Sequence, residues 1–184
     1  MTARSAAATS PKPAATAYAA AMTALASGVA LVTCRHAERP WGMTVTAFAS
    51  VSAHPPTVLV SLGSGTVSAR AIAATGSFGV SVLSRDQVEV AEYGAVGGAA
   101  KFLDAFVEPA DRPSASPAIS HALAHLDCDV VDVVDAADHT VFFAHVHRVR
   151  RRRGGDPLLY HGRGYGSFVP LEPTTERTLR CISS

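Results

Sequence analysis

The chain has 184 residues, the length of one domain with a substantial core. Its 16 basic and 15 acidic side chains leave a formal charge of +1, so we expect neither a nucleic-acid nor a membrane partner. Cys34, Cys128 and Cys181 form no C-x-x-C pair, which argues against a disulfide framework or a zinc ribbon and favours a cytoplasmic location.

The chain begins with a segment rich in Ala, Ser, Thr and Pro. Pro11 and Pro13 interrupt it, and it lacks the apolar run of a secretory leader, so we interpret residues 1–15 as a flexible extension. A helix is expected over residues 16–27, ended by Gly28. No stretch is apolar enough, for long enough, to span a membrane.

The first half then alternates short β-forming runs with two helical stretches. Pro55 and Pro56 force a turn between the second and third runs, which makes those two strands antiparallel neighbours. Gly76 ends the first helix, and a glycine-rich connector over residues 94–100 follows the second. The predicted strands are residues 29–33, 44–51, 57–62 and 78–83, and the predicted helices are residues 66–74 and 85–93.

The second half reads as a helix followed by strands. We expect the helix over residues 117–126, strands over residues 126–134 and 140–149 joined by a hairpin at Asp138 and His139, and a strand over residues 158–161. Residues 162–166 are predicted to form a flexible turn that exposes Tyr165, and residues 171–184 a tail. Many strands, few helices and short connections favour a mainly β protein, built as a closed or partly split barrel.

The most informative segment is residues 42–62, GMTVTAFASVSAHPPTVLVSL. Hydroxyls recur at every second position in its first strand, while apolar residues interrupt the pattern, as in a kinked or bulged strand. A flat polar ligand could lie along such a strand. Together with the preceding run GVALVT at residues 28–33, this segment resembles the flavin reductase family, whose members carry a GVavVT strand followed by G-x-T…S-V-S-x-x-P-P.

The resemblance covers residues 16 to about 170. It implies a mainly β fold, an FMN-binding split β-barrel with a few short helices. It also implies an NAD(P)H:flavin oxidoreductase that passes a hydride from NADH or NADPH to FMN or FAD and supplies reduced flavin to a partner monooxygenase. Members of the family usually form homodimers with the flavin at the subunit boundary.

The resemblance also implies roles for individual residues. His139, in a hairpin resembling the family's G-D-H-x-x-x-x-G, becomes the candidate catalytic residue, although Ala137 and Ala144 replace the two glycines. Tyr165 and His161 would cover the pyridine nucleotide. The other expected flavin-binding residues are Thr44, Val45, Thr46, Ala47, Ser50, Val51 and Ser52 at the ring and ribityl chain, and Gly63, Ser64, Thr66, Lys101 and Phe102 at the phosphate or ring edge.

Plainer interpretations remain open for these residues. The hydroxyl-rich strand could face water, Thr66 could be an ordinary helix cap, Lys101 could be solvated, and His139 could be a turn residue. The arginine run at residues 150–153 is either a solvated hairpin end or an attractor of nucleotide phosphate. The pairs His121/His125 and His145/His147 lack a third ligand motif, so we expect no metal.

Two other functions compete with flavin reduction. One is a flavin-binding electron carrier without free-flavin turnover, and the other is a related split-barrel oxidase or a deazaflavin-dependent reductase. The sequence contains no G-x-S-x-G, H-E-x-x-H, Walker or Rossmann motif that would point to different chemistry.

Overall fold

A computed structural model of the protein describes residues 14–110, 112 and 115–171. This part of the chain is mainly β with short helices, which confirms the predicted fold class. Almost all of the predicted extension and tail, and Cys181, fall outside the described residues. Cys34 and Cys128 are free cysteines buried in the core. None of the described helices is long and apolar enough to cross a membrane.

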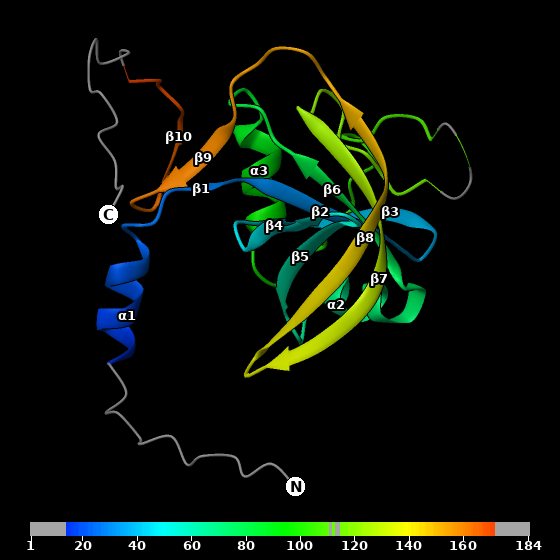
Figure 1. The fold of residues 1–184 in the computed structure, drawn as a ribbon, viewed down its shortest axis with the longest axis horizontal. Helices are drawn as coiled ribbons and strands as arrows, with labels where there is room; N and C mark the ends of the chain where they lie inside the picture. The colour runs from blue at the N-terminus through cyan, green and yellow to red at the C-terminus, as the bar shows by residue number, and fades with distance from the viewer. Residues whose placement is uncertain (1–13, 111, 113–114, 172–184) are drawn as a thin grey trace, which may run out of the picture.

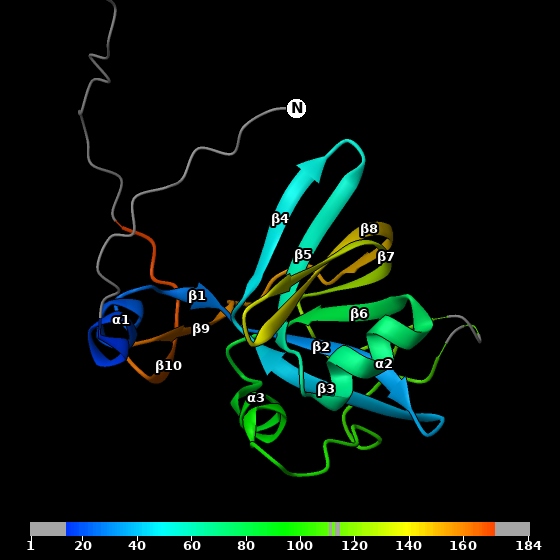
Figure 2. The same cartoon turned by 90° about the horizontal axis from the view of Figure 1, so that it is seen from below.

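The main sheet is a split barrel. Its strands are β2 (Ala30–His36), β3 (Arg39–Val45), β4 (Phe48–Ala53), β5 (Pro56–Gly63), β6 (Ser77–Val82), β7 (Ala124–Ala136) and β8 (His139–Arg151). They pair in the order β3-β2-β6-β7-β8-β5-β4. The two edge strands, β3 and β4, are linked by only Thr46 and Ala47, so the sheet must curl until its edges meet there. From this link β3 and the β4–β5 hairpin diverge, which leaves the barrel split at the other end (Figure 2).

A second, smaller sheet lies beside the barrel. Its strands are β1 (Ser27–Gly28), β9 (Leu158–His161) and β10 (Gly164–Ser167), in the order β1-β9-β10. The helix α1 (Ala15–Met22) lies next to this sheet, on the side away from the barrel (Figure 1). No residue of α1 is buried.

Two helices cover opposite faces of the barrel wall. Ala30, Val32 and Cys34 of β2 face the interior core, where α2 (Val67–Thr75) contributes Ala69 and Ile72. The alternate residue Leu31 faces a second cluster, to which α3 (Val88–Ala95) contributes Val90 and Ala91. Because both faces of β2 are covered, its sequence reads as a continuous apolar run. The predicted helix end at Gly76 is confirmed, with Gly76 at φ 70°, and Thr66 caps the helix, which was its plainer interpretation.

One predicted strand and one predicted helix in the interior of the chain are wrong. Residues 44–51 form the end of β3, a two-residue link and the start of β4, because the two halves pair with different strands, β2 and β5. Residues 117–126 are not a helix: they form a turn that leads into β7 at Ala124. The apolar spacing there arises because Ala118 and Ile119 are buried under the barrel wall, and not from a helical face.

The predicted ends of the chain also need correction. The first helix stops at Met22, and Ser27 and Gly28 pair with β9. Residues 164–167 form strand β10 against β9, so Tyr165 is half-buried in a strand and not displayed on a flexible turn. The helix expected over residues 85–93 starts three residues later, at Val88.

Candidate functional site

The N-terminus of α2 opens onto a cavity of about 400 Å³. The Thr66 side chain accepts the Ala69 N–H at 3.1 Å, so the N–H groups of Val67 and Ser68 stay outside the helix's own hydrogen bonds. Lys101 also lines the cavity, and partial burial lowers the pKa of its ammonium group. Trp41 also lines the cavity. A cation in the same cavity as a helix N-terminus is suited to a phosphate group.

Next to this cavity, the end of β5 meets the start of β8. Gly63 is paired with His139, the Ser64 hydroxyl is 2.9 Å from the Thr140 hydroxyl, and the Ser64 N–H donates to the Asp138 carbonyl at 3.0 Å. The structure therefore brings the predicted residues Gly63, Ser64 and His139 to one corner, beside Thr66.

His139 is held in a defined orientation at this corner. Its Nδ1 lies 2.8 Å from a carboxylate oxygen of Asp138, and its side chain is 49% exposed. The hydrogen bond with His139 lowers the pKa of Asp138. With Nδ1 engaged, Nε2 is the ring nitrogen that can meet a ligand.

The predicted ring-binding segment has two kinds of side chain. Thr44 donates to the Ala91 carbonyl at 2.6 Å and so points towards α3, while Val45 is 7% exposed and packs in the interior core. The remaining residues lie at the surface or accept a local bond, as the Ser52 hydroxyl does from the His54 N–H at 3.1 Å. The exposed members are Thr46, Ala47, Ser50 and Val51. The side chains of Thr44 and Val45 are therefore engaged within the chain.

Trp41 lines the cavity, whereas the predicted residue Phe102 is not among its lining residues and packs against Trp41. The Phe102 ring lies edge-on to Trp41 with centroids 5.0 Å apart, and Arg39 stacks over Phe102 at 3.9 Å. Arg39 is fixed in turn by a 2.7 Å ion pair with Asp104. The sequence analysis missed Trp41, the single tryptophan of the chain. Its place directly before the G-M-T motif, two residues from the cavity residue Met43, was the available signal.

The two residues expected at the pyridine nucleotide lie in the small sheet. Tyr165 pairs with Tyr160, their ring centroids are 5.3 Å apart, and burial raises the pKa of Tyr165. His161 lines a different cavity, of about 390 Å³, together with Tyr18 and Met22 around α1. In a single chain, then, His161 does not share the cavity of Thr66 and Lys101.

The histidine pairs considered for metal binding are explained by other contacts. His121 lies in a turn at φ 63° while His125 is buried in β7, so the helical face that would have joined them does not exist. His147 binds Asp129 at 3.0 Å.

Comparisons with known proteins point to one family. Residues 22–168 match the family model described as flavin reductase like domain. The chain is 37% identical over 154 residues to the reductase component of 4-nitrophenol 4-monooxygenase/4-nitrocatechol 2-monooxygenase from Rhodococcus opacus, covering 83% of this chain and 80% of that protein. It is 33% identical over 148 residues to an NADH-dependent FAD reductase from Streptomyces globisporus, covering 78% and 80%.

Solved structures give the same picture. The structure of the flavin reductase PheA2 superposes with a TM-score of 0.76 at 32% identity, covering 86% of this chain and all of that one. The flavin reductase of a styrene monooxygenase from Pseudomonas putida S12 superposes with a TM-score of 0.72 at 32% identity, covering 84% and 99%.

Proposed function

The chain belongs to the flavin reductase-like family, and from that premise we propose that it carries a hydride from NADH or NADPH to FMN or FAD and delivers the reduced flavin to a partner monooxygenase. The relatives include NADH-dependent flavin reductases and reductase components of monooxygenases. The observation that carries the proposal is the cavity at the N-terminus of α2, which Thr66 and Lys101 both line in a protein with this family's fold.

We assign the flavin phosphate to this cavity. The first-turn N–H groups of α2 and the Lys101 ammonium offer positive charge to a phosphate group. The ring would lie along residues 44–52, where backbone groups at the link between β3 and β4 can pair with its polar edge. The flavin supplies the hydride chemistry, so the protein's task is to hold two flat rings together and to keep water out.

His139 is proposed to position the nicotinamide. It is half-exposed at the corner next to Ser64, and Asp138 fixes its ring so that Nε2 can act as a donor or an acceptor. A residue in this role acts on the nucleotide and leaves flavin affinity nearly unchanged. For Lys101 we expect the reverse: its substitution should weaken flavin binding and leave the interaction with the nucleotide nearly unchanged.

We further propose that the protein is a homodimer that completes this site. Two features support it. The helix α1 has no buried residue, although its Tyr18 and Met22, and Leu25 just beyond it, are large, and an isolated eight-residue helix is unstable in water. The barrel also exposes apolar residues, namely Val51 in the ring-binding segment and Val131, Val133 and Val134 on β7. The free thiols Cys34 and Cys128 favour a cytoplasmic location.

Flavin-dependent NADH oxidation tests the function. The wild type should oxidise NADH continuously when FMN or FAD is added in excess, whereas an electron carrier would stop after one equivalent. Trp41 lines the cavity, so its fluorescence should fall when flavin binds and gives the affinity directly.

Ala47→Trp should abolish flavin binding with the fold intact by circular dichroism, since Ala47 is exposed. Unchanged affinity would refute the ring position. Light scattering at micromolar concentration tests the dimer.

A further inference from the structure

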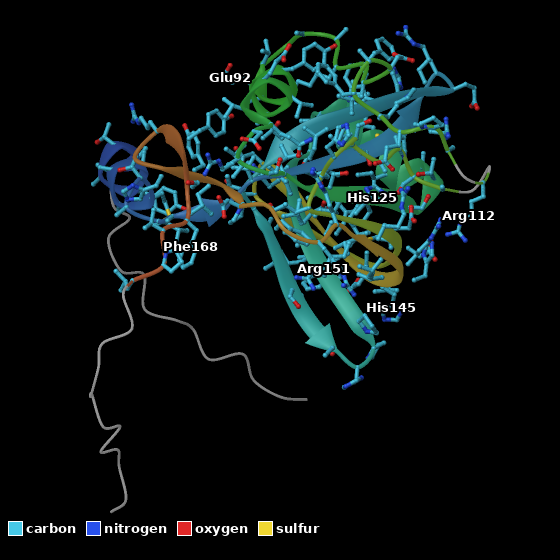
Figure 3. All side chains as sticks on the ribbon, turned by 90° about the horizontal axis from the view of Figure 1, so that it is seen from above. Glu92, Arg112, His125, His145, Arg151 and Phe168 are labelled. Carbon is cyan, nitrogen blue, oxygen red and sulfur yellow. The ribbon has the colours of Figure 1, made fainter. Side chains whose placement is uncertain are left out.

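A larger cavity, of about 560 Å³, lies on a different part of the barrel. It forms where β2 and β6 separate: their pairing ends at Thr33 and Gly79, and beyond it Cys34 and Arg35 continue with β3 alone. Residues 115–117 and Arg112 border the opening. Figure 3 shows Arg112 on the opposite side of the molecule from Phe168, which follows the small sheet.

This cavity is separate from the flavin site. It reaches the C-terminal end of α2 at Thr75, whereas the flavin cavity lies at Thr66, about 13 Å away along a nine-residue helix. It also reaches His147 on β8, which is eight residues along that strand from His139, or about 26 Å. A ligand in one cavity therefore leaves the other free.

The cavity is lined by a buried carboxylate with one unused oxygen. The Asp127 side chain is 3% exposed. Its Oδ1 accepts the Ser116 N–H at 3.0 Å and also the Ser116 hydroxyl. Its Oδ2 has no hydrogen-bond partner in the part of the chain that the structure describes. The Arg112 guanidinium stays 3.9 Å from Oδ2, which is too long for a hydrogen bond. Buried carboxylate oxygens are almost always satisfied, so a donor is missing here.

The rest of the lining defines what could supply that donor. Two exposed cations, Arg35 and Arg112, border the cavity, and the other acidic residue, Asp129, is already paired with His147 at 3.0 Å. Ala115 and Pro117 provide an apolar wall. An anionic group is therefore attracted to the rim and an N–H or O–H donor to the interior.

We propose that this cavity is a second ligand site, for a small organic anion that carries an amine or hydroxyl donor at its other end. The donor binds Asp127 Oδ2, the anionic group binds Arg35 and Arg112, and the flat body of the molecule lies against Pro117. The proposal does not depend on flavin reduction.

Isothermal titration calorimetry on the full chain, without flavin, tests the proposal with 4-aminobenzoate as the probe. Benzoate lacks the donor and aniline lacks the anion, so each should bind about tenfold more weakly or worse, because each leaves a charged partner unsatisfied. Asp127→Asn keeps the bonds to Ser116 but loses the acceptor charge, and should remove the advantage of 4-aminobenzoate over benzoate. Lys101→Ala, in the flavin cavity, should leave 4-aminobenzoate affinity unchanged while weakening flavin binding.

The three-probe series on the wild type gives a result even if Asp127→Asn fails to fold. Equal affinities for the three probes, or no binding at millimolar concentration, would overturn the proposal. Loss of 4-aminobenzoate binding in Lys101→Ala would also overturn it, because the probe would then occupy the flavin cavity.

Discussion

Two groups of hydroxyl side chains on this barrel differ in one respect, whether their hydrogen bonds are made within the chain. Thr33, Ser81 and Ser116 are buried or half-buried. Thr33 donates to the Pro117 carbonyl, and the hydroxyls of Ser81 and Ser116 each bond to a ring nitrogen of His125. Thr46 and Ser50 are exposed at the link and on the neighbouring hairpin. Polar residues that fasten a loop form their hydrogen bonds within the chain, whereas the two that we propose for flavin binding, Thr46 and Ser50, are exposed.

The buried group is organised around His125. The Ile119 N–H donates to the Ser81 hydroxyl, which is 2.8 Å from His125 Nδ1, and His125 Nε2 is 2.9 Å from the Ser116 hydroxyl. Because Ser116 donates to Asp127, every bond is made when the neutral ring carries its proton on Nε2. Burial lowers the pKa of His125 to about 4, which keeps the ring neutral.

The most damaging change should be Gly79→Ala, which tests whether the buried group is tightly packed. A Cβ at Gly79 would fall within 3 Å of Thr33, Ser116 and His125. We expect the free energy of unfolding to drop by about 2–4 kcal/mol. Urea denaturation measures it. Gly97→Ala, where a Cβ meets nothing within 4 Å, is the matched control and should change stability little. Equal stability of the two variants would contradict the packing.

The second-largest expected effect is a loss of stability in acid, caused by protonation of His125 in the buried group. The folded-state pKa of His125, about 4, lies below its usual 6.5, so between these values the unfolded chain binds a proton that the folded protein refuses. Stability therefore falls as the pH drops through this window, by about 3 kcal/mol in total from this group. Asp127, whose pKa is lowered from 3.8, loses its contribution only at still lower pH. His125→Gln should flatten the profile between pH 6.5 and 4; an unchanged slope would contradict the assignment.

On the open side, His139→Ala should slow hydride transfer with little loss of stability, because the side chain is 49% exposed. Loss of one positioning hydrogen bond, worth about 1–3 kcal/mol, predicts a several-fold to hundredfold decrease in kcat/KM for NADH. Stopped-flow reduction at several NADH concentrations measures this. Flavin affinity, from Trp41 fluorescence, should stay constant. A wild-type rate would make His139 a turn residue only.

The smallest expected effect is a gain in stability. Ala137 adopts φ 57° in the turn before His139, a conformation that glycine occupies without strain. Ala137→Gly should raise the free energy of unfolding by about 0.5–1 kcal/mol, since relief of strain exceeds the added chain entropy. Thermal denaturation detects the shift. A lower melting temperature would mean that the turn is not strained.

The sequence predicted strands well where apolar residues alternate because one face of the strand is buried. In β8, Phe142 and Ala144 face the core and Phe143 faces the other side. It failed at Thr46 and Ala47, because the switch from β2 to β5 as pairing partner depends on barrel closure and leaves no local signal. It also failed at residues 117–126, where apolar residues are buried by a turn. Among site residues, Thr66 and His139 follow from local motifs, whereas the approach of Lys101 and Trp41 to Thr66 depends on tertiary contacts.

As a flavin reductase, this chain binds flavin and reduces it with NADH or NADPH. Anaerobic titration of the purified protein with NADH, in the presence of one equivalent and then excess FAD or FMN, tests it most directly. We predict that the flavin's visible absorbance falls in proportion to added NADH until all flavin, bound and free, is reduced. Flavin that binds and quenches Trp41 but keeps its absorbance on addition of NADH and of NADPH would contradict the account.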